Sequence, residues 1–365
     1  MRSGPCFSFM KRSIFVFLAI LICACLSGSA VHGQGELRVG PIVSGTMEDG
    51  SAETSDSSAP SQTPGGMDMP TAGVSGVPSE TPEPTPEPPF RLAWATDTQI
   101  MIAHYREMLP GFTAMCQWIA DHAEEQNIVA FIHTGDMVDS PANKGQWNTF
   151  STGMETIAAK MPLFVTLGNH DFYDSKLKPV WKDQFFFQSI PKNQRYRDGR
   201  ASYAELSVGS TDLLLIQLAF REASNLTAIR WLKSVCDAHA DMPVIFVVHG
   251  YLSNKGVRMT RAALMEKELV SKCPNIRLIL CGHSRGIARQ TFAYDDDRDG
   301  IKERTVHVLM HDLQQDRKRY GYFNILTYDL AANSLSVDSY SPFLDDYIYN
   351  DKKPDAERFT IENIF

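Results

Sequence analysis

Short apolar runs alternate with amphipathic stretches from Phe90 onward. Residues 114–125, 226–239 and 260–272 repeat apolar side chains at the spacing of a helix that is buried on one face. The apolar runs around these helices have the length of strands and predict β-structure at residues 90–95, 128–133, 163–167, 201–208, 213–218, 244–248 and 276–280. Residues 306–341 predict further strands and turns. Apolar strands separated by helices predict an α/β domain with strands buried on both faces.

This pattern is absent before Phe90. Residues 31–89 are rich in Ser, Thr, Pro and Gly and contain few large apolar side chains, which predicts a disordered linker. The proline-rich stretch at residues 81–89 is typical of an extended, stiff spacer. We therefore place the folded domain at residues 90–345, on a stalk, and assign residues 346–365 to a C-terminal tail.

The first 30 residues have the pattern of an export signal. Basic residues precede an apolar run at residues 14–26, and Gly28-Ser29-Ala30 offers a cleavage site of small side chains. The run is short for a membrane span. Two alternatives to cleavage stay open, namely a lipid anchor on Cys25 and an uncleaved anchor. The sequence thus predicts a secreted or cell-surface protein that the N-terminus can tether to a membrane or wall.

Composition narrows the range of partners. The chain has 365 residues, of which 43% are hydrophobic, and a formal net charge of −8. It has no long basic run, so a bound nucleic acid scaffold is not expected, because phosphate backbones are held by clustered Lys and Arg. A small phosphorylated substrate is compatible with this charge if a metal ion neutralises the phosphate locally.

Four cysteines remain after removal of the signal: Cys116, Cys236, Cys273 and Cys281. Cys236 and Cys273 each precede a predicted strand, so they can be neighbours, and an oxidising compartment would allow a disulfide. The alternative is four buried thiols. The spacing of the cysteines does not decide between them.

Polar residues of the types that bind metals follow five of the predicted strands. The clusters are Asp97-Thr98-Gln99, Gly135-Asp136-Met137-Val138-Asp139, Gly168-Asn169-His170-Asp171, His249-Gly250 and Gly282-His283-Ser284-Arg285. In open α/β sheets, ligands bind beyond the carboxyl ends of the strands. Asp, Asn and His together supply the oxygen and nitrogen donors that suit Mn, Fe or Zn. The sequence therefore predicts a metal centre at these strand ends.

The order of these clusters resembles the calcineurin-like metallophosphoesterase pattern D-x-H, G-D-x-x-D, G-N-H-[DE], a lone His, and G-H-x-H. The resemblance extends over residues 90–341. It implies a four-layer α/β/β/α sandwich. The C-terminal stretches at residues 305–315, 320–322 and 339–342 resemble an exported branch of the superfamily that carries Gln in the first motif.

The resemblance also implies a ligand set with one full site and one altered site. Asp136 would bridge two divalent cations, and Asn169, His249 and His283 would complete the full site. The other site would take Asp97 and Asp136, with Gln99 and Arg285 standing where the motifs have His. Gln99 can offer an oxygen, whereas Arg285 has no lone pair to give. Oxygen donors favour Mn, Mg or Ca over Zn or Fe, so one or two cations of open identity are expected.

The implied reaction is hydrolysis of a phosphomonoester or phosphodiester by metal-activated water that attacks phosphorus in line. We expect His170 to donate a proton to the leaving group, with Asp171 orienting its ring and Asp139 just outside the ligands. Arg285 can compensate for the lost metal charge by binding a phosphate oxygen directly.

Two other functions compete with this one. A catalytically degenerate, metal-stabilised binding domain on a stalk would follow if Arg285 filled the altered site and blocked it. Alternatively, Gly282-His283-Ser284-Arg285-Gly286 matches the G-x-S-x-G elbow of serine hydrolases, with Ser284 as nucleophile and His307 or His311 as base. The serine hydrolase interpretation leaves Gly135-Asp136 and residues 168–171 unexplained.

One further motif is acidic. Residues 295–300 read D-x-D-x-D-G, the start of a calcium loop, but Val306 stands where the closing acid belongs. A solvated hairpin tip is the favoured interpretation.

Overall fold

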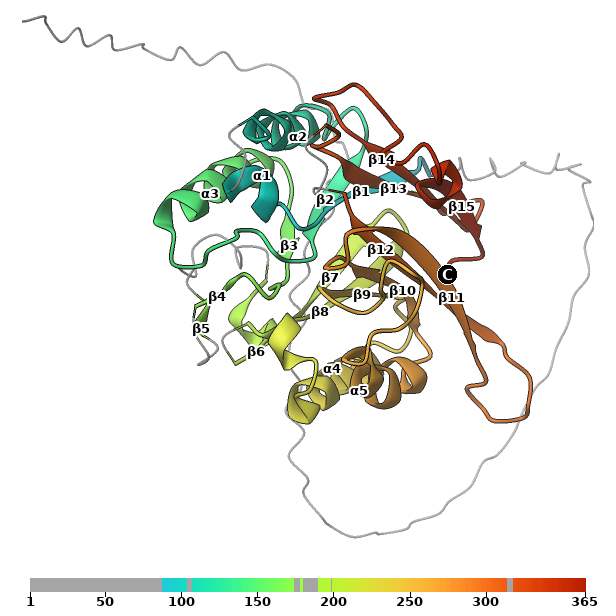
Figure 1. Cartoon of the computed structure of the whole chain (residues 1–365). Coiled ribbons are helices and arrows are strands. Elements are labelled where there is room, and N and C mark those ends of the chain that lie inside the picture. The colour runs from blue at the N-terminus through green and yellow to red at the C-terminus, as the bar shows by residue number, and fades with distance from the viewer. Residues whose placement is uncertain (1–86, 104–106, 174–177, 180–189, 198, 314–317) are drawn as a thin grey trace, which may run out of the picture. The chain divides into compact units, whose positions relative to one another are not determined.

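The computed structural model describes residues 87–103, 107–173, 178–179, 190–197, 199–313 and 318–365 (Figure 1). The signal peptide, Cys25 and nearly all of the predicted linker lie outside the described residues. Within the described part of the chain, no helix combines the length and apolar character that a membrane span needs.

The first of two large sheets has six strands in the order β15-β14-β13-β1-β2-β3. Its parallel half consists of β1 (Phe90–Ala95), β2 (Ile128–His133) and β3 (Leu163–Val165). Its antiparallel half consists of β13 (Phe323–Asp329), β14 (Ser334–Tyr340) and β15 (Arg358–Glu362). The carboxyl ends of β1, β2 and β3 consequently meet at one edge of this sheet.

The second sheet has seven strands in the order β11-β12-β10-β9-β8-β7-β6. Its parallel centre comprises β8 (Thr211–Leu218), β9 (Val244–Val248), β10 (Ile276–Cys281) and β12 (Arg304–Asp312). Antiparallel strands close both sides, namely β6 (Arg195–Tyr196) and β7 (Ala201–Val208) on one and β11 (Gly286–Tyr294) on the other. A separate ribbon pairs β4 (Phe172–Tyr173) with β5 (Lys178–Pro179).

Helices cover the outer face of each sheet (Figure 1). The helices α2 (Leu109–Asp121) and α3 (Lys144–Ala158), together with the short α1 (Gln99–Ala103), share a core with the six-stranded sheet. The helices α4 (Leu226–Ala238) and α5 (Ala262–Glu268) share another core with the seven-stranded sheet. A third core lies between the two sheets. The predicted four-layer α/β/β/α sandwich is confirmed.

The position of β1 between two cores explains why its residues form a continuous apolar run. Successive side chains of a strand point to opposite faces of the sheet. Leu92 and Trp94 therefore enter the core between the sheets, whereas Ala93 and Ala95 face the helices. All four are fully or almost fully buried, as expected for a strand covered on both faces.

Several elements differ from the prediction, among them α1 and β11, neither of which was predicted. The sequence did not predict α3, whose buried Trp147, Phe150, Met154 and Ile157 have helical spacing but are separated by Gly and Thr, which are poor helix formers. Residues 346–365 were assigned to a tail outside the domain. They contain β15, which pairs with β14 and brings Ile361 into the core between the sheets. A five-residue edge strand carries too few apolar side chains to stand out in a sequence.

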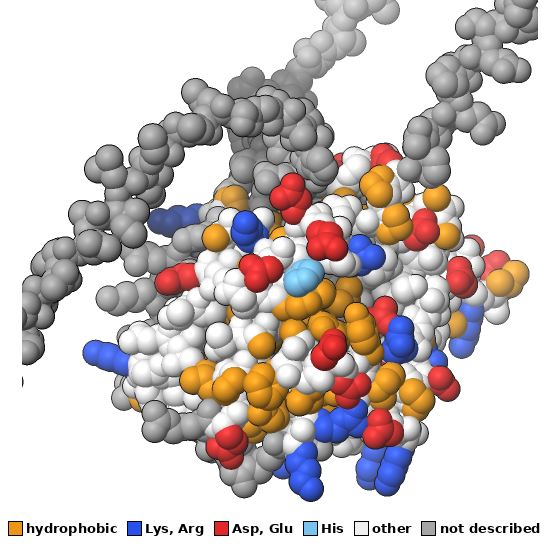
Figure 2. Space-filling model, turned by 90° about the horizontal axis from the view of Figure 1, so that it is seen from above, with side chains coloured by type: hydrophobic (Ala, Val, Ile, Leu, Met, Phe, Trp, Pro, Cys, Tyr) orange, Lys and Arg blue, Asp and Glu red, His pale blue; other side chains and the backbone are white. Residues whose placement is uncertain are grey.

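Surface charge is mixed on the face that Figure 2 shows. Acidic and basic side chains are interspersed there around a band of hydrophobic side chains. The predicted metal-binding side chains lie instead among buried residues at the strand ends, and most of them have almost no exposed area.

Candidate metal centre

Three of the predicted ligands converge on an atom of a fourth, Nε2 of His249. Oδ2 of Asp136, Oδ1 of Asn169 and Nδ1 of His283 each lie 3.2 Å from it. Asp136 and Asn169 follow β2 and β3 of one sheet, whereas His249 and His283 follow β9 and β10 of the other. The donor atoms of Asp136, His249 and His283 lie within 4.8 Å of one another, close enough to share one ion.

The ring of His249 is oriented so that Nε2 faces this cluster. Its Nδ1 lies 3.0 Å from the backbone carbonyl of Thr134, which can only accept a hydrogen bond. The proton therefore belongs on Nδ1, and the lone pair of Nε2 is directed at the other ligands. This arrangement is how proteins orient a metal-binding imidazole.

The electrostatic potential at the cluster is negative. Burial alone would lower the pKa of His249, but the carboxylates of Asp136 and Asp97 outweigh it and raise the pKa to about 9. Burial and the neighbouring His249 lower the pKa of His283 to about 4. The surrounding carboxylates thus stabilise the positively charged form of the buried His249 ring. A divalent cation bound at the same place would be stabilised in the same way.

The altered half of the centre contains Asp97 and Gln99. Burial raises the pKa of Asp97 to about 6, against the opposing effect of His249. Its Oδ2 accepts hydrogen bonds from Oγ1 of Thr96 at 2.6 Å and from the backbone N–H of His283 at 3.0 Å. Nε2 of Gln99 lies 3.3 Å from Oδ2 of Asp136, and its buried Oε1 has no hydrogen-bond partner. An orphaned amide oxygen beside two carboxylates fits a cation that takes oxygen donors.

Arg285 does not occupy this half. Its side chain is exposed, and among the described residues no hydrogen bond or ion pair joins its guanidinium to Asp97 or Asp136. Its backbone carbonyl accepts a hydrogen bond of 2.9 Å from the side chain of Asn254. Arg285 therefore lies on the loop that carries His283, and its exposed side chain does not fill the altered half.

Close approach of the loops depends on two glycines. A Cβ atom at Gly168 would lie 2.1 Å from Oδ1 of Asp136, and one at Gly282 would lie 2.1 Å from Oδ2 of Asp97. Asp97, Asp136 and His283 themselves have positive φ angles of 52°, 54° and 72°. Such backbone costs on the order of 1–3 kcal/mol per residue and concentrates at functional sites, so packing around the centre holds the ligands in strained positions.

Asp171 has a different role from the one predicted. Its carboxylate accepts hydrogen bonds from the backbone N–H groups of Asp136 and Gly168, both at 2.8 Å, and of Met137 at 2.9 Å. It is fully buried and binds two ligand-bearing loops, and within the described part of the chain no hydrogen bond or ion pair joins it to the ring of His170. Neighbours in a turn commonly point in different directions, so adjacency in sequence was a poor guide. Asp171 positions the loop of the bridging carboxylate.

The ring of His170 is held by Asp139 instead. Its Nδ1 lies 2.9 Å from the backbone carbonyl of Asp139 and 3.4 Å from the carboxylate of that residue. The side chain of His170 is 39% exposed. Burial would lower its pKa, but Asp136 and Asp139 raise it above the usual value for histidine. With Nδ1 engaged, Nε2 is the atom that can give a proton to a bound molecule.

Three residues that support the centre were not predicted. His133 is fully buried, accepts a hydrogen bond from the backbone N–H of Gly135 and pairs with Thr98, which shapes the loop before Asp136. Thr134 supplies the carbonyl that orients His249. The ring of Phe220 packs 4.8 Å from the ring of His283 and 5.3 Å from that of His249. The only signal for them in the sequence was proximity to the motifs, and for Phe220 there was none.

Ser284 lacks the setting of a nucleophile elbow. That motif needs a strand, a sharp turn and then a helix, whereas the residues after Ser284 enter strand β11. The two candidate bases are engaged elsewhere, His307 with Thr291 and His311 with Asn324. The serine hydrolase alternative is therefore wrong.

The acidic motif forms the tip of the β11–β12 hairpin. Carboxylate oxygens of Asp295, Asp297 and Glu303 lie within 4.8 Å of one another. Backbone N–H groups of Asp299 and Gly300 already donate to Asp295 at 3.1 and 2.9 Å. The carboxylates thus order an exposed turn, and Glu303, at the ninth position of the calcium template, joins them.

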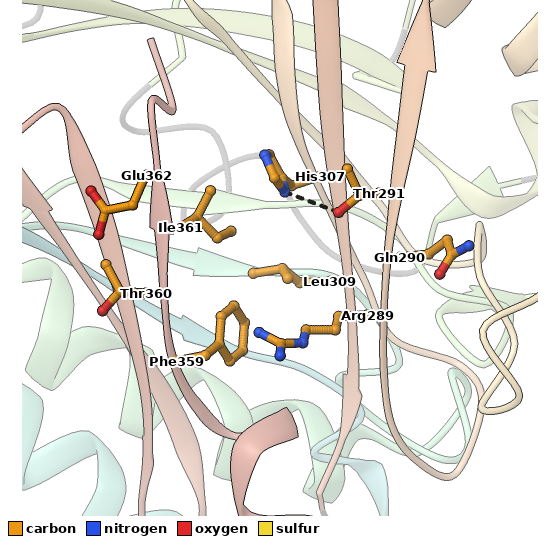
Figure 3. Close-up of a pocket in the computed structure, with 9 residues that line it drawn as sticks. All are labelled: Arg289, Gln290, Thr291, His307, Leu309, Phe359, Thr360, Ile361 and Glu362. Carbon is orange, nitrogen blue, oxygen red and sulfur yellow. Dashed lines mark hydrogen bonds between the residues drawn. The ribbon is translucent and has the colours of Figure 1, made fainter.

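A cavity of about 480 Å³ lies between β11, β12 and β15 (Figure 3). The guanidinium of Arg289 stacks 4.2 Å from the ring of Phe359, and Nδ1 of His307 lies 3.3 Å from Oγ1 of Thr291. None of the candidate metal ligands lines this cavity. It is formed where the edges of the two sheets diverge and is separate from the metal centre.

Comparison with known proteins supplies independent information on the family. Residues 90–284, more than half of the chain, match the family described as calcineurin-like phosphoesterase. The uncharacterized protein YvnB of Bacillus subtilis (strain 168) is 30% identical over 271 residues, which are 72% of this chain. The chain spans only 20% of the length of that relative.

Solved structures with a similar fold include purple acid phosphatase PPD1 from yellow lupin (Lupinus luteus) seeds. It is 15% identical, with a TM-score of 0.49, and the match covers 76% of this chain and 55% of that one. Another is TT1561 of Thermus thermophilus, at 12% identity and a TM-score of 0.38, with 76% of this chain and 100% of that one covered.

Proposed function

Because this chain belongs to the calcineurin-like phosphoesterase family, we propose that it is a hydrolase of phosphate esters that depends on one or two divalent cations. The observation that carries the proposal is the convergence of Asp136, Asn169 and His283 on Nε2 of His249 from four loops and two sheets. A structural role alone would not need nitrogen and oxygen donors to crowd together at 3.2 Å in a buried, strained site.

Each half of the centre would hold a cation with its own donors. Asp136, Asn169, His249 and His283 suit a cation that accepts nitrogen and oxygen, and Asp97, Gln99 and Asp136 suit one that prefers oxygen. A divalent cation supplies a Lewis acid that makes water more acidic and offsets the negative charge of the phosphate. The protein contributes the fixed loops, which Gly168, Gly282 and Asp171 allow to pack closely.

His170 supports a hydrolytic role because it can act on the leaving group. The carbonyl of Asp139 keeps a proton on Nδ1 of the ring, and Asp136 and Asp139 raise the pKa of the ring, which favours a second proton on Nε2. Nε2 can then donate its proton to the oxygen that departs from phosphorus. The partial exposure of the ring lets a substrate reach that atom.

Arg285 is proposed to bind a phosphate oxygen from the rim of the site. Its side chain is exposed and belongs to the same loop as His283. The exposure of Arg285 favours the enzyme over the catalytically degenerate binding domain, because that alternative required Arg285 to fill the altered half.

We also propose that the substrate is a small phosphorylated compound met outside the cytoplasm, at the cell surface or in the medium. The support is the pattern of the first 30 residues and the proline-rich stretch that follows them. Edman sequencing or mass spectrometry of the mature N-terminus separates cleavage near Ala30, lipidation of Cys25 and retention of the whole segment.

The direct test is hydrolysis of p-nitrophenyl phosphate and bis-p-nitrophenyl phosphate by the full chain. Metal-free protein is compared with protein supplied with Mn²⁺, Mg²⁺, Ca²⁺, Zn²⁺ or Fe²⁺. We expect metal-dependent turnover that Asn169→Ala abolishes, and the preferred substrate separates a monoesterase from a diesterase. Asn148→Ala, at an exposed position of α3, is the matched control outside the centre. Absence of turnover with every metal, in folded protein that still binds a cation, would contradict the proposal.

A further inference from the structure

Cys236 and Cys273 come together although 37 positions separate them in the sequence. Cys236 lies in the last turn of α4, and Cys273 lies three residues before β10. Both are free thiols in this structure, and the proximity of the Cys273 thiol together with burial raises the pKa of Cys236. Both residues are 1% exposed and belong to the core between α4, α5 and the seven-stranded sheet.

The contact between these two segments is built into the fold. The side chain of Asn275 donates hydrogen bonds to the backbone carbonyls of Cys236 at 3.2 Å and of His239 at 3.0 Å. These bonds fasten the segment before β10 to the carboxyl end of α4. The backbone segments that carry both thiols are thus held together by contacts other than those of the thiols themselves.

The other two described cysteines have different surroundings. Cys116 lies in α2 and belongs to the core beside the six-stranded sheet. Cys281 ends β10, where the backbone N–H groups of Tyr251 and Leu252 hydrogen-bond its sulfur. Both are as deeply buried as Cys236 and Cys273. Burial is therefore common to all four, whereas a second thiol within reach distinguishes one pair.

We propose that Cys236 and Cys273 are a modification site at which a disulfide forms when the protein is exported. Two thiols are oxidised to one disulfide, and a disulfide of a thiol–disulfide oxidoreductase in the oxidising compartment accepts the two electrons and two protons and becomes a dithiol. The proposal is independent of phosphate ester hydrolysis. It depends on export only for the supply of the oxidant.

The disulfide would connect α4 with β10 and enclose β9 and α5 within its loop. Cys273 precedes β10, and His283 follows the other end of the same strand, so the crosslink lies away from the metal ligands. Because both sulfurs are buried in the folded protein, oxidation takes place while α4 and β10 are docking. The expected effect is on folding and thermal stability, with metal binding unchanged.

The test counts free thiols in the full chain produced in two ways. One sample is secreted into an oxidising compartment, and the other is produced in a reducing cytoplasm and refolded in a glutathione redox buffer. Each is unfolded in the presence of N-ethylmaleimide, and the peptides that contain the four cysteines are analysed by mass spectrometry. We expect Cys116 and Cys281 to be alkylated and the peptides of Cys236 and Cys273 to be linked until a reductant is added.

Variants separate a specific disulfide from random oxidation. Cys236→Ala should release Cys273 to the maleimide, and Cys116→Ala should leave the linked peptide unchanged. Reduction should lower the Tm of wild-type and Cys116→Ala protein by roughly 5 °C and leave that of Cys236→Ala unchanged. Alkylation of all four cysteines in the refolded sample, or a link to a different cysteine, would overturn the proposal whatever the variants do. A link that forms on refolding and is absent after secretion would overturn only its occurrence on export.

Discussion

The two halves of the metal centre share Asp136 but differ in how the fold prepares them. In the intact half, Oδ1 of Asn169 and Nδ1 of His283 already lie 3.2 Å from Nε2 of His249, and the carbonyl of Thr134 orients His249. In the altered half, Asp97 is tied to Thr96 and to the backbone of His283, and the amide oxygen of Gln99 is buried without a partner. Replacement of one metal ligand therefore does not necessarily remove the other donors of the site. Two carboxylates remain there, with one amide oxygen that has no hydrogen-bond partner among the described residues.

The largest expected effect comes from removing a nitrogen donor of the intact half. His283→Ala deletes a ligand whose metal supplies several kcal/mol of charge stabilisation, so kcat should fall by about 10³-fold or more. The bound metal should also fall by about one equivalent in elemental analysis. His307→Ala is the control, since His307 pairs with Thr291 outside the centre. A His283→Ala variant with full metal content and full turnover would show that His283 is not a required ligand of the intact half.

The next largest effect concerns proton donation by His170. His170→Ala should slow hydrolysis by about 10²-fold for a substrate with a poor leaving group such as an alkyl alcohol. It should slow hydrolysis much less for p-nitrophenyl esters, because p-nitrophenolate departs without protonation. Rates measured over a series of leaving groups check this. An equal loss across the series would assign His170 to binding rather than to proton transfer.

Restoring a histidine in the altered half should change the metal preference rather than the fold. Gln99→His places an imidazole beside Asp97 and Asp136, so affinity for a second Zn²⁺ should rise by about tenfold relative to Mn²⁺. Isothermal titration of metal-free protein measures both affinities. Gln99→Glu is the matched variant, because it retains oxygen donors and should favour Mn²⁺. Identical preferences in both variants would mean that the altered half does not bind a cation through residue 99.

The smallest expected effect belongs to the exposed rim. Arg285→Ala should raise KM by about fivefold and leave kcat nearly unchanged, because an exposed guanidinium contributes roughly 1 kcal/mol to binding of a phosphate. Arg285→Lys should recover part of the affinity. Steady-state kinetics at two salt concentrations test both, since a charge interaction weakens as salt increases. Unchanged KM in the alanine variant would remove Arg285 from the substrate site.

Much of the fold could be predicted from the sequence because it depends on the local pattern of apolar and polar residues. The bounds predicted for β1, β2, β7 and β9 agree with the structure, since a short apolar run ends sharply where a strand leaves the core. α3 and β15 were missed for a related reason. α3 has an apolar stripe interrupted by poor helix formers, and β15 is stabilised by its pairing with β14 more than by its own residues. Both depend on packing that a local pattern does not record.

The donors that the protein has, and the order in which its strands deliver them, could be read from the residues alone. Asp97, Asp136, Asn169, His249 and His283 were identifiable because each follows an apolar run within a few residues. Which atoms such residues contact was settled only by the packing of the layers. This packing brings Asp171 to the backbone of the Asp136 loop, Asp139 to the ring of His170, and Cys273 close to Cys236. Such contacts join segments far apart in the chain, so they follow from how the layers pack and not from the identity of neighbouring residues.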